Sequence, residues 1–86
     1  MKALNQLQGT KEDRERSIKD GLRVERARAG VSQAALCEAI GTNPSTYSGW
    51  ESRDGSIGFE EAWRIAEVYG ISLDQLAGRT APAAVA

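Results

Sequence analysis

Apolar side chains recur at helical spacing along most of the chain, and the interruptions fall at glycine, serine or proline. Residues 11–29 contain no proline and consist mostly of good helix formers, with Ile18, Leu22 and Ala29 on one face. This pattern predicts a long first helix. Gly30 is expected to end it, because glycine readily adopts the left-handed conformation found just past helix C-termini.

A short second helix is predicted over 33–40. Ser32 can cap its start with a hydroxyl, and Gly41 supplies the residue that ends it. Leu36 and Ile40 stand four residues apart, so they lie one turn apart on the same face. That face is expected to be buried.

A third helix is expected over 44–51. The stretch 42–45 holds a capping residue followed by Pro44. Proline suits the first position of a helix, because the N–H that it lacks would have no partner there. Tyr47 and Trp50 stand three residues apart and are predicted to face the core.

The remaining pattern predicts a loop over 52–58, an amphipathic helix over 59–69 ended by Gly70, and a short helix over 73–77 capped by Ser72. The residues expected on the buried side of the amphipathic helix are Phe59, Ala62, Trp63, Ala66 and Tyr69. The helical spacing of the aromatic residues favours core packing over a surface on which the bases of single-stranded nucleic acid stack.

These elements predict an all-α fold, a compact bundle of five helices around one core, since 86 residues are too few for two. Within the chain we expect a flexible N-terminal arm over 1–10, one folded domain over 11–78 and a flexible C-terminal tail over 79–86.

Composition excludes several classes of function. Cys37 is the single cysteine and there is no histidine, so no intrachain disulfide or usual zinc site can form, and Cys37 is expected to be an unreactive core residue. No phosphate-binding loop or catalytic set is present, so we expect no enzyme, no cofactor and no small-molecule substrate. Without a membrane span or an apolar leader, a cytoplasmic protein is expected.

Charge is distributed unevenly along the chain. The formal net charge is −1 at pH 7, which is low for a protein that binds DNA phosphates. Residues 1–30 hold eight of the eleven basic residues and five acidic ones. In the first helix Arg14, Arg16, Lys19, Arg23 and Arg28 alternate with Glu12, Asp13, Glu15, Asp20 and Glu25. This alternation predicts a solvated face with internal ion pairs rather than a dedicated DNA patch.

The second and third helices with their turn fit a helix-turn-helix from Gln33 to Ser52, a motif whose second helix enters the major groove of DNA. Cys37 puts a small side chain where the two helices cross, and Gly41 allows the chain to reverse. The apolar residues that fall where the helices pack together are Leu36, Ile40, Tyr47 and Trp50.

In these positions the chain resembles the lambdoid phage repressor and Cro family, also called the xenobiotic-response-element type. The resemblance extends from about residue 18 to residue 76. Three segments carry it: Arg26-x-x-x-Gly30-Val31-Ser32-Gln33-x-x-Leu36, Ile40-Gly41-x-x-x-Ser45-Thr46-Tyr47-x-x-Trp50-Glu51 and Ile65-Ala66-x-x-Tyr69-Gly70-Ile71-Ser72-x-x-x-Leu76. Their combination is specific, whereas each alone is weak.

The resemblance implies a lambda-repressor-like DNA-binding domain of bacterial or phage origin, a transcriptional regulator that binds double-stranded DNA as a homodimer. It implies that Arg26 pairs with Glu51 and that Gln33, at a helix N-terminus, faces a phosphate, which the helix dipole favours. The residues that would face the DNA bases are Asn43, Pro44, Ser45, Thr46, Ser48 and Gly49.

The chain departs from the family pattern at two positions. Gly49 stands where the family usually has a long polar side chain, and Arg53 stands where it usually has glycine. Sequence reading of DNA would then depend on Asn43, Ser45, Thr46 and Ser48, helped by Arg53. These side chains predict modest base readout.

An alternative of another class is a protein-interaction module on the same fold, antitoxin-like or a regulatory partner, which grips a protein with the third helix and the acidic C-terminal part. For a homodimer, the candidate contacts are Ile57, Tyr69, Ile71 and the segment 73–85. Binding to duplex DNA separates the two interpretations.

Overall fold

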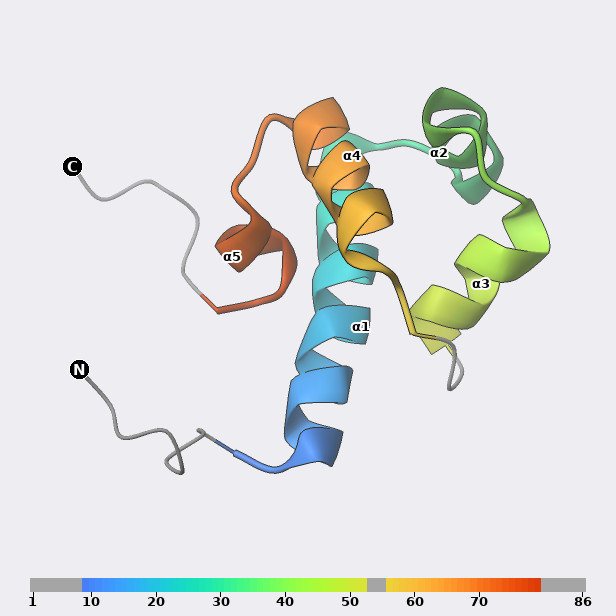
Figure 1. Ribbon diagram of the computed structural model, residues 1–86. Helices are drawn as coiled ribbons and strands as arrows, with labels where there is room; N and C mark the ends of the chain where they lie inside the picture. The colour runs from blue at the N-terminus through green and yellow to red at the C-terminus, as the bar shows by residue number, and fades with distance from the viewer. Residues whose placement is uncertain (1–8, 53–55, 80–86) are drawn as a thin grey trace, which may run out of the picture.

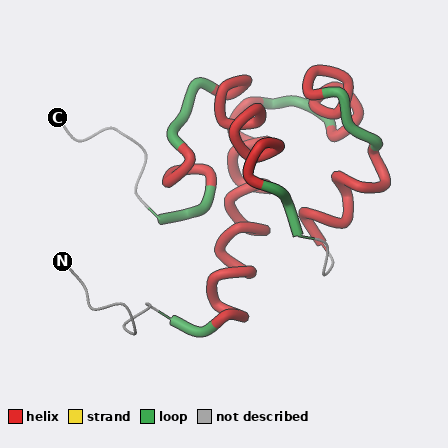
Figure 2. Tube along the Cα trace, viewed as in Figure 1, coloured by secondary structure: helices red, strands yellow, loops and turns green. Residues whose placement is uncertain are grey.

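The computed structural model describes residues 9–52 and 56–79, which form five α-helices and no strand. The helices are α1 (Lys11–Ala29), α2 (Gln33–Ile40), α3 (Pro44–Ser52), α4 (Phe59–Tyr69) and α5 (Leu73–Leu76). α3 and α5 pack against the long α1, while α2 packs against α3 and α4 (Figure 1, Figure 2). The predicted all-α fold is confirmed, whereas the arm over 1–10 and the tail over 79–86 fall mostly outside the described residues.

Side-chain caps fix where the helices begin. The Ser32 and Ser72 hydroxyls each accept a hydrogen bond at 3.0 Å from the backbone N–H three residues later, as the sequence predicts. α1 begins with a capping box, in which Thr10 and Asp13 each accept from the other's backbone N–H. At the other end of α2, Gly41 has a φ of 71°, a left-handed conformation that glycine adopts without strain.

All five helices contribute to the core. Its buried apolar residues are Leu22, Leu36, Cys37, Ile40, Tyr47, Trp50, Ile65, Ala66 and Leu76. Tyr47 is fully buried, and its ring meets that of Trp50 edge to face, with ring centroids 5.8 Å apart. Both residues therefore face inward, as predicted, and they fix which side of α3 faces solvent.

Two aromatic residues that the sequence placed in the core are exposed, so that prediction was wrong. Phe59 is 71% exposed and Trp63 is 50% exposed. Ile65, which the helical pattern did not place on the buried side, is fully buried, and its neighbour Ala66 is buried as well. One face of a helix can bury a stripe only a little over 100° wide, and these residues fill it, which leaves Phe59 and Trp63 at its edge.

α5 approaches α1 too closely for any side chain at Gly21. A Cβ atom there would lie 1.9 Å from the backbone carbonyl oxygen of Leu76. Next to it, the Ser17 hydroxyl donates a hydrogen bond of 2.7 Å to the carbonyl oxygen of Ala77. This contact fixes α5 on α1. The helical pattern gave no indication of a special role for Gly21, because an isolated glycine inside a helix can occur without any packing requirement.

Glu25 was expected on the solvated face of α1, and this expectation was also wrong. Glu25 is only 5% exposed. Arg28 pairs with its carboxylate at 2.8 Å, and the side-chain amide of Gln75 donates to it at 3.2 Å. α5 covers Glu25 and supplies this second bond, which a pattern within α1 alone could not indicate.

Candidate DNA-binding interface

The helix-turn-helix consists of α2, the turn after Gly41 and α3, so its bounds match the predicted motif over 33–52. The turn closes through the backbone, where the N–H of Thr42 donates to the carbonyl oxygen of Cys37 at 2.9 Å. Arg64 from α4 donates to the carbonyl oxygen of Ile40 at 2.9 Å, which satisfies the C-terminal end of α2. The end of α2 is therefore satisfied within the turn and tied to α4.

The outer side of α3 faces solvent. Of the predicted base-facing residues, Asn43, Pro44, Ser45 and Thr46 are exposed, and Ser48 and Gly49 are half-buried. Tyr47 and Trp50 occupy the buried side of the helix. The structure thus leaves four of the six positions exposed and two partly accessible.

One of these side chains already has a partner within the domain. The Asn43 side-chain oxygen Oδ1 accepts a hydrogen bond of 2.8 Å from the backbone N–H of Ser45, so Asn43 caps α3. At Ser48 only the main chain is engaged: its backbone carbonyl oxygen accepts from the Ser52 hydroxyl at 2.8 Å. Arg53, the remaining predicted base contact, lies outside the described residues.

Gly49 is not required by the packing of the domain. A Cβ atom at this position would have no neighbour within 4 Å, and the residue lies inside α3. A Gly49→Ala variant is therefore expected to gain about 0.5–1 kcal/mol in the free energy of unfolding, measured by chemical denaturation. A loss of stability would show that the glycine has a structural role.

Glu51 is the centre of a buried hydrogen-bond network. Glu51 is only 3% exposed. Arg26 donates to both of its carboxylate oxygens, from Nε at 2.7 Å and from Nη2 at 3.2 Å. The same Arg26 donates to the Val31 carbonyl oxygen at 3.0 Å. The Tyr47 hydroxyl donates a hydrogen bond to the Glu51 carboxylate at 2.5 Å, and the Gln33 side-chain amide donates another to it at 3.1 Å. The ion pair that the resemblance implied is present, and it joins α1, α2 and α3.

The network determines the charge states of its members. Burial alone would raise the pKa of Glu51, but the hydrogen bonds from Arg26, Tyr47 and Gln33 and the positive charge of Arg26 outweigh it and lower that pKa. The hydrogen bond to Glu51 raises the pKa of Arg26. Burial, followed by the bond to Glu51, raises the pKa of Tyr47. A charged pair and a neutral phenol therefore persist near pH 7.

Gln33 has a role that the sequence did not reveal. It is the first residue of α2 and half-buried, and its side-chain NH₂ group donates to Glu51. The side chain thus ties the N-terminus of α2 to α3 across 18 residues of sequence. A glutamine side chain does not show from sequence which distant residue it contacts, so only a phosphate contact was predicted for Gln33.

Arg23 fixes the far end of α3. Its Nη1 donates to the carbonyl oxygen of Glu51 at 2.6 Å, and its Nη2 pairs with Asp20 on α1. Arginine at a helix C-terminus both satisfies a carbonyl group and complements the helix dipole. Arg23 and Arg26 together hold α3 against α1 from its last turn.

Tyr69 carries the one buried side-chain polar atom without a hydrogen-bond partner among the described residues. Burial raises the pKa of Tyr69 to about 12, so its hydroxyl stays protonated. Removing an unpaired hydroxyl is neutral or favourable, and Tyr69→Phe is expected to keep or raise the free energy of unfolding by up to about 1 kcal/mol. A loss above about 1 kcal/mol in a thermal melt would mean that the hydroxyl has a partner.

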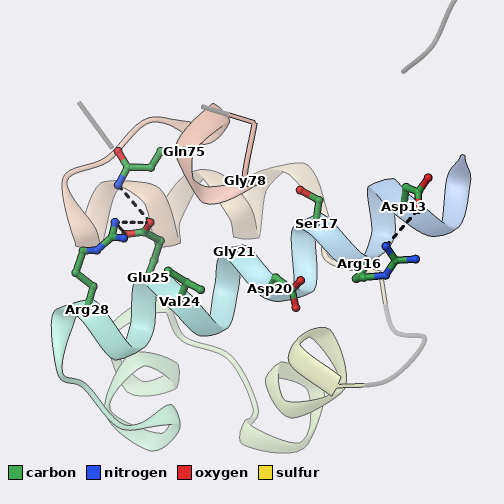
Figure 3. A pocket seen from close by; sticks show the side chains of 10 residues that line it. All are labelled: Asp13, Arg16, Ser17, Asp20, Gly21, Val24, Glu25, Arg28, Gln75 and Gly78. Atoms are coloured by element: carbon green, nitrogen blue, oxygen red, sulfur yellow. Dashed lines mark hydrogen bonds and ion pairs between the residues drawn. The ribbon is translucent and has the colours of Figure 1, made fainter. Parts of the chain in front are cut away.

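A groove of about 420 Å³ lies on the α5 side of α1, separate from α3 (Figure 3). Val24 lines it beside the ion pair of Arg28 with Glu25, and the ion pair of Arg16 with Asp13 at 3.2 Å lies at the other end. These pairs agree with the internal pairing predicted for α1. The third lining carboxylate, Asp20, pairs with Arg23 outside the groove, so the groove presents no patch of one sign.

Three other kinds of site find no support in the part of the chain that the structure describes. None of its helices is both long and apolar enough to span a membrane, and no group of three or more potential metal ligands occurs in it. Burial, with a smaller contribution from the negative charge of Glu51, raises the pKa of Cys37. This thiol is protonated and enclosed, which makes it unreactive.

The similarity to known proteins lies in the region that contains the helix-turn-helix. A family model described as helix-turn-helix matches residues 22–76. The chain is 40% identical over 60 residues to repressor protein CI of Enterobacteria phage phi80, covering 70% of this chain and 25% of that protein. It is 34% identical over 64 residues to the cryptic phage CTXphi transcriptional repressor RstR of Vibrio cholerae serotype O1, covering 74% and 57%. No solved structure matches significantly.

The chain therefore spans about a quarter of the first relative and just over half of the second. Both relatives are named as repressors, and neither name is that of an enzyme, in agreement with the sequence analysis. The family match covers α2, α3 and α4 entirely, together with the Arg26–Glu51 pair. This chain belongs to the helix-turn-helix family, in its phage-repressor type.

Proposed function

We propose that this chain is the DNA-binding domain of a transcriptional repressor that binds duplex DNA in the cytoplasm, without a cofactor. It binds as a homodimer on two half-sites about one helical turn apart, with α3 in the major groove. The observation that carries the proposal is the uncovered outer side of α3, fixed against α2 by the buried Glu51 network. Such rigid presentation is what base readout needs.

Contacts to DNA divide between α2 and α3. The N-terminal turn of α2 offers backbone N–H groups and a positive dipole end to a phosphate, close to Gln33. On α3, Ser45, Thr46 and Ser48 offer hydroxyl groups and one methyl group to the base edges. None of these makes the bidentate contacts of arginine or glutamine, so each gives modest discrimination.

Phosphate attraction is limited as well. The described arginines with ion pairs or carbonyl bonds inside the domain are Arg14, Arg16, Arg23, Arg26, Arg28, Arg64 and Arg79. Affinity for DNA falls with salt in proportion to the number of phosphates that are neutralised. We therefore expect a shallow salt dependence and weak binding by one copy, which is why two copies are needed.

The test uses fluorescence anisotropy with a duplex selected from a random-sequence library, titrated at several salt concentrations. Ser45→Ala is expected to weaken binding about five-fold, the equivalent of one hydrogen bond. Val24→Ala, on the α5 side of α1, is the control and should leave the dissociation constant unchanged. If no duplex binds at low salt, or if Ser45→Ala binds as tightly as the parent chain, the proposal fails.

A protein-interaction module on the same fold stays the second candidate, and one observation favours it. Phe59 and Trp63 place two aromatic rings on the surface, as protein-binding faces do. Such a module would leave the outer side of α3 without a role in DNA binding. Failure of every duplex to bind would select this alternative.

A further inference from the structure

The outward edge of α4 carries an aromatic pair that the fold does not use. The rings of Phe59 and Trp63 contact each other with centroids 6.0 Å apart, at an interplanar angle of 55°. The other large apolar residues that are exposed, Val24 and Val68, stand alone. Val68 is five residues beyond Trp63, so it points about 140° away around the helix. Among the large apolar side chains that are exposed in the described residues, Phe59 and Trp63 form the one ring contact.

Charges beside the pair indicate what can cover it. Glu60 and Arg64 form an ion pair at 3.0 Å on the neighbouring stripe of α4, with side-chain exposures of 73% and 47%. A second α4 that lies antiparallel to the first brings each Glu60 near the other copy's Arg64, which is the self-complementarity of a two-fold contact. DNA does not fit, because Glu60, Glu61 and Glu67 outnumber the single Arg64 on this helix.

The place of the pair in the fold suits a contact between neighbouring half-sites. Six residues of sequence separate the end of α3 from the start of α4, so the pair stays within a short connection of α3. Of the contacts suggested from the sequence, Ile57, Tyr69, Ile71 and Leu73 pack against the core. Phe59 and Trp63 are therefore better placed for a partner than those residues are.

We propose that the face formed by Phe59 and Trp63 receives the same face of a second copy of this chain when both occupy adjacent half-sites. The inference rests on the proposed function and names its dimer contact. A buried aromatic side chain contributes roughly 150–250 Å², so two partly exposed pairs bury less than the roughly 1,200 Å² of a stable interface. The two copies therefore associate on DNA and are monomeric when free at micromolar concentration.

The experiment compares duplexes that carry one half-site and two half-sites of the selected sequence. Phe59→Ser with Trp63→Ser is expected to bind one half-site like the parent chain and to lose at least ten-fold cooperativity on two. Val68→Ser, an equally exposed change on the same helix, should keep the cooperativity. Trp63 fluorescence should shift to shorter wavelength on two half-sites alone, and Trp63→Phe should remove that shift.

Two results would overturn the inference: cooperativity that survives in the double variant, or a parent chain that binds two half-sites without cooperativity. If no duplex binds, the proposed function itself has failed, and sedimentation of the free chain at about 1 mM then decides. Self-association that the double variant lacks would still support the contact. Equal behaviour of parent and double variant would reject it.

Discussion

A Glu51→Ala variant is expected to lose about 3–5 kcal/mol in the free energy of unfolding, the largest effect of any single change considered. The substitution leaves the Arg26 guanidinium, the Tyr47 hydroxyl and the Gln33 amide without their shared acceptor in a buried site. For a domain of this size the melting temperature should fall by at least about 12 °C, measured by circular dichroism.

The loss of stability in acid is a second test of the role of Glu51. The pKa of Glu51 is lowered in the folded chain, so the carboxylate stabilises the fold above its unfolded pKa, and that stability is lost as the pH falls through the folded pKa. Glu51→Gln keeps the shape and removes the charge, and should flatten the loss of stability in acid. Glu60→Gln, on an exposed ion pair, is the control. Parent-like stability and acid behaviour in both Glu51 variants would contradict the network.

Gly21→Ala is expected to destabilise the domain by about 2–3 kcal/mol, although alanine is the better helix former. The new methyl group would lie 1.9 Å from the Leu76 carbonyl oxygen, a backbone atom that can move only with α5. Hydrogen exchange should show the amides of α5 opening first. Thermal unfolding measures the overall loss.

Gly49→Ala is the matched control, because it makes the same change inside a helix at a position where the added Cβ would meet nothing within 4 Å beyond the adjoining backbone of its own helix. If the free energy of unfolding falls for Gly21→Ala and rises for Gly49→Ala, the loss at Gly21 is due to close packing and not to helix propensity. An unchanged or higher melting temperature for Gly21→Ala would contradict the close approach of α1 and α5.

Local rules sufficed to predict much of this fold. Ser32, Gly41 and Pro44 act within one turn of their own position, so their effects on helix ends can be inferred from neighbouring residues. The helix-turn-helix could be placed for the same reason. The pairing of Arg26 with Glu51 came from family resemblance, since 25 residues separate the partners and spacing gives no indication of it.

The failures share one physical cause, which is that burial depends on elements distant in sequence. Glu25 is covered by α5, and Gly21 is small because α5 crosses there. Phe59 and Trp63 have the same periodicity as core residues, and the packing of α4 against α2 and α5 decides that Ile65 turns inward in place of these rings. For the site, the contact between Gln33 and Glu51 exists only once α2 and α3 are packed.

Amide chemical shifts of the whole chain, followed during titration with the selected duplex, test whether α2 and α3 present one DNA-binding surface. We expect the largest changes at the N-terminal turn of α2 and over 43–49, with little change along the groove between α1 and α5. Changes concentrated in that groove, with residues 43–49 unaffected, would contradict this expectation.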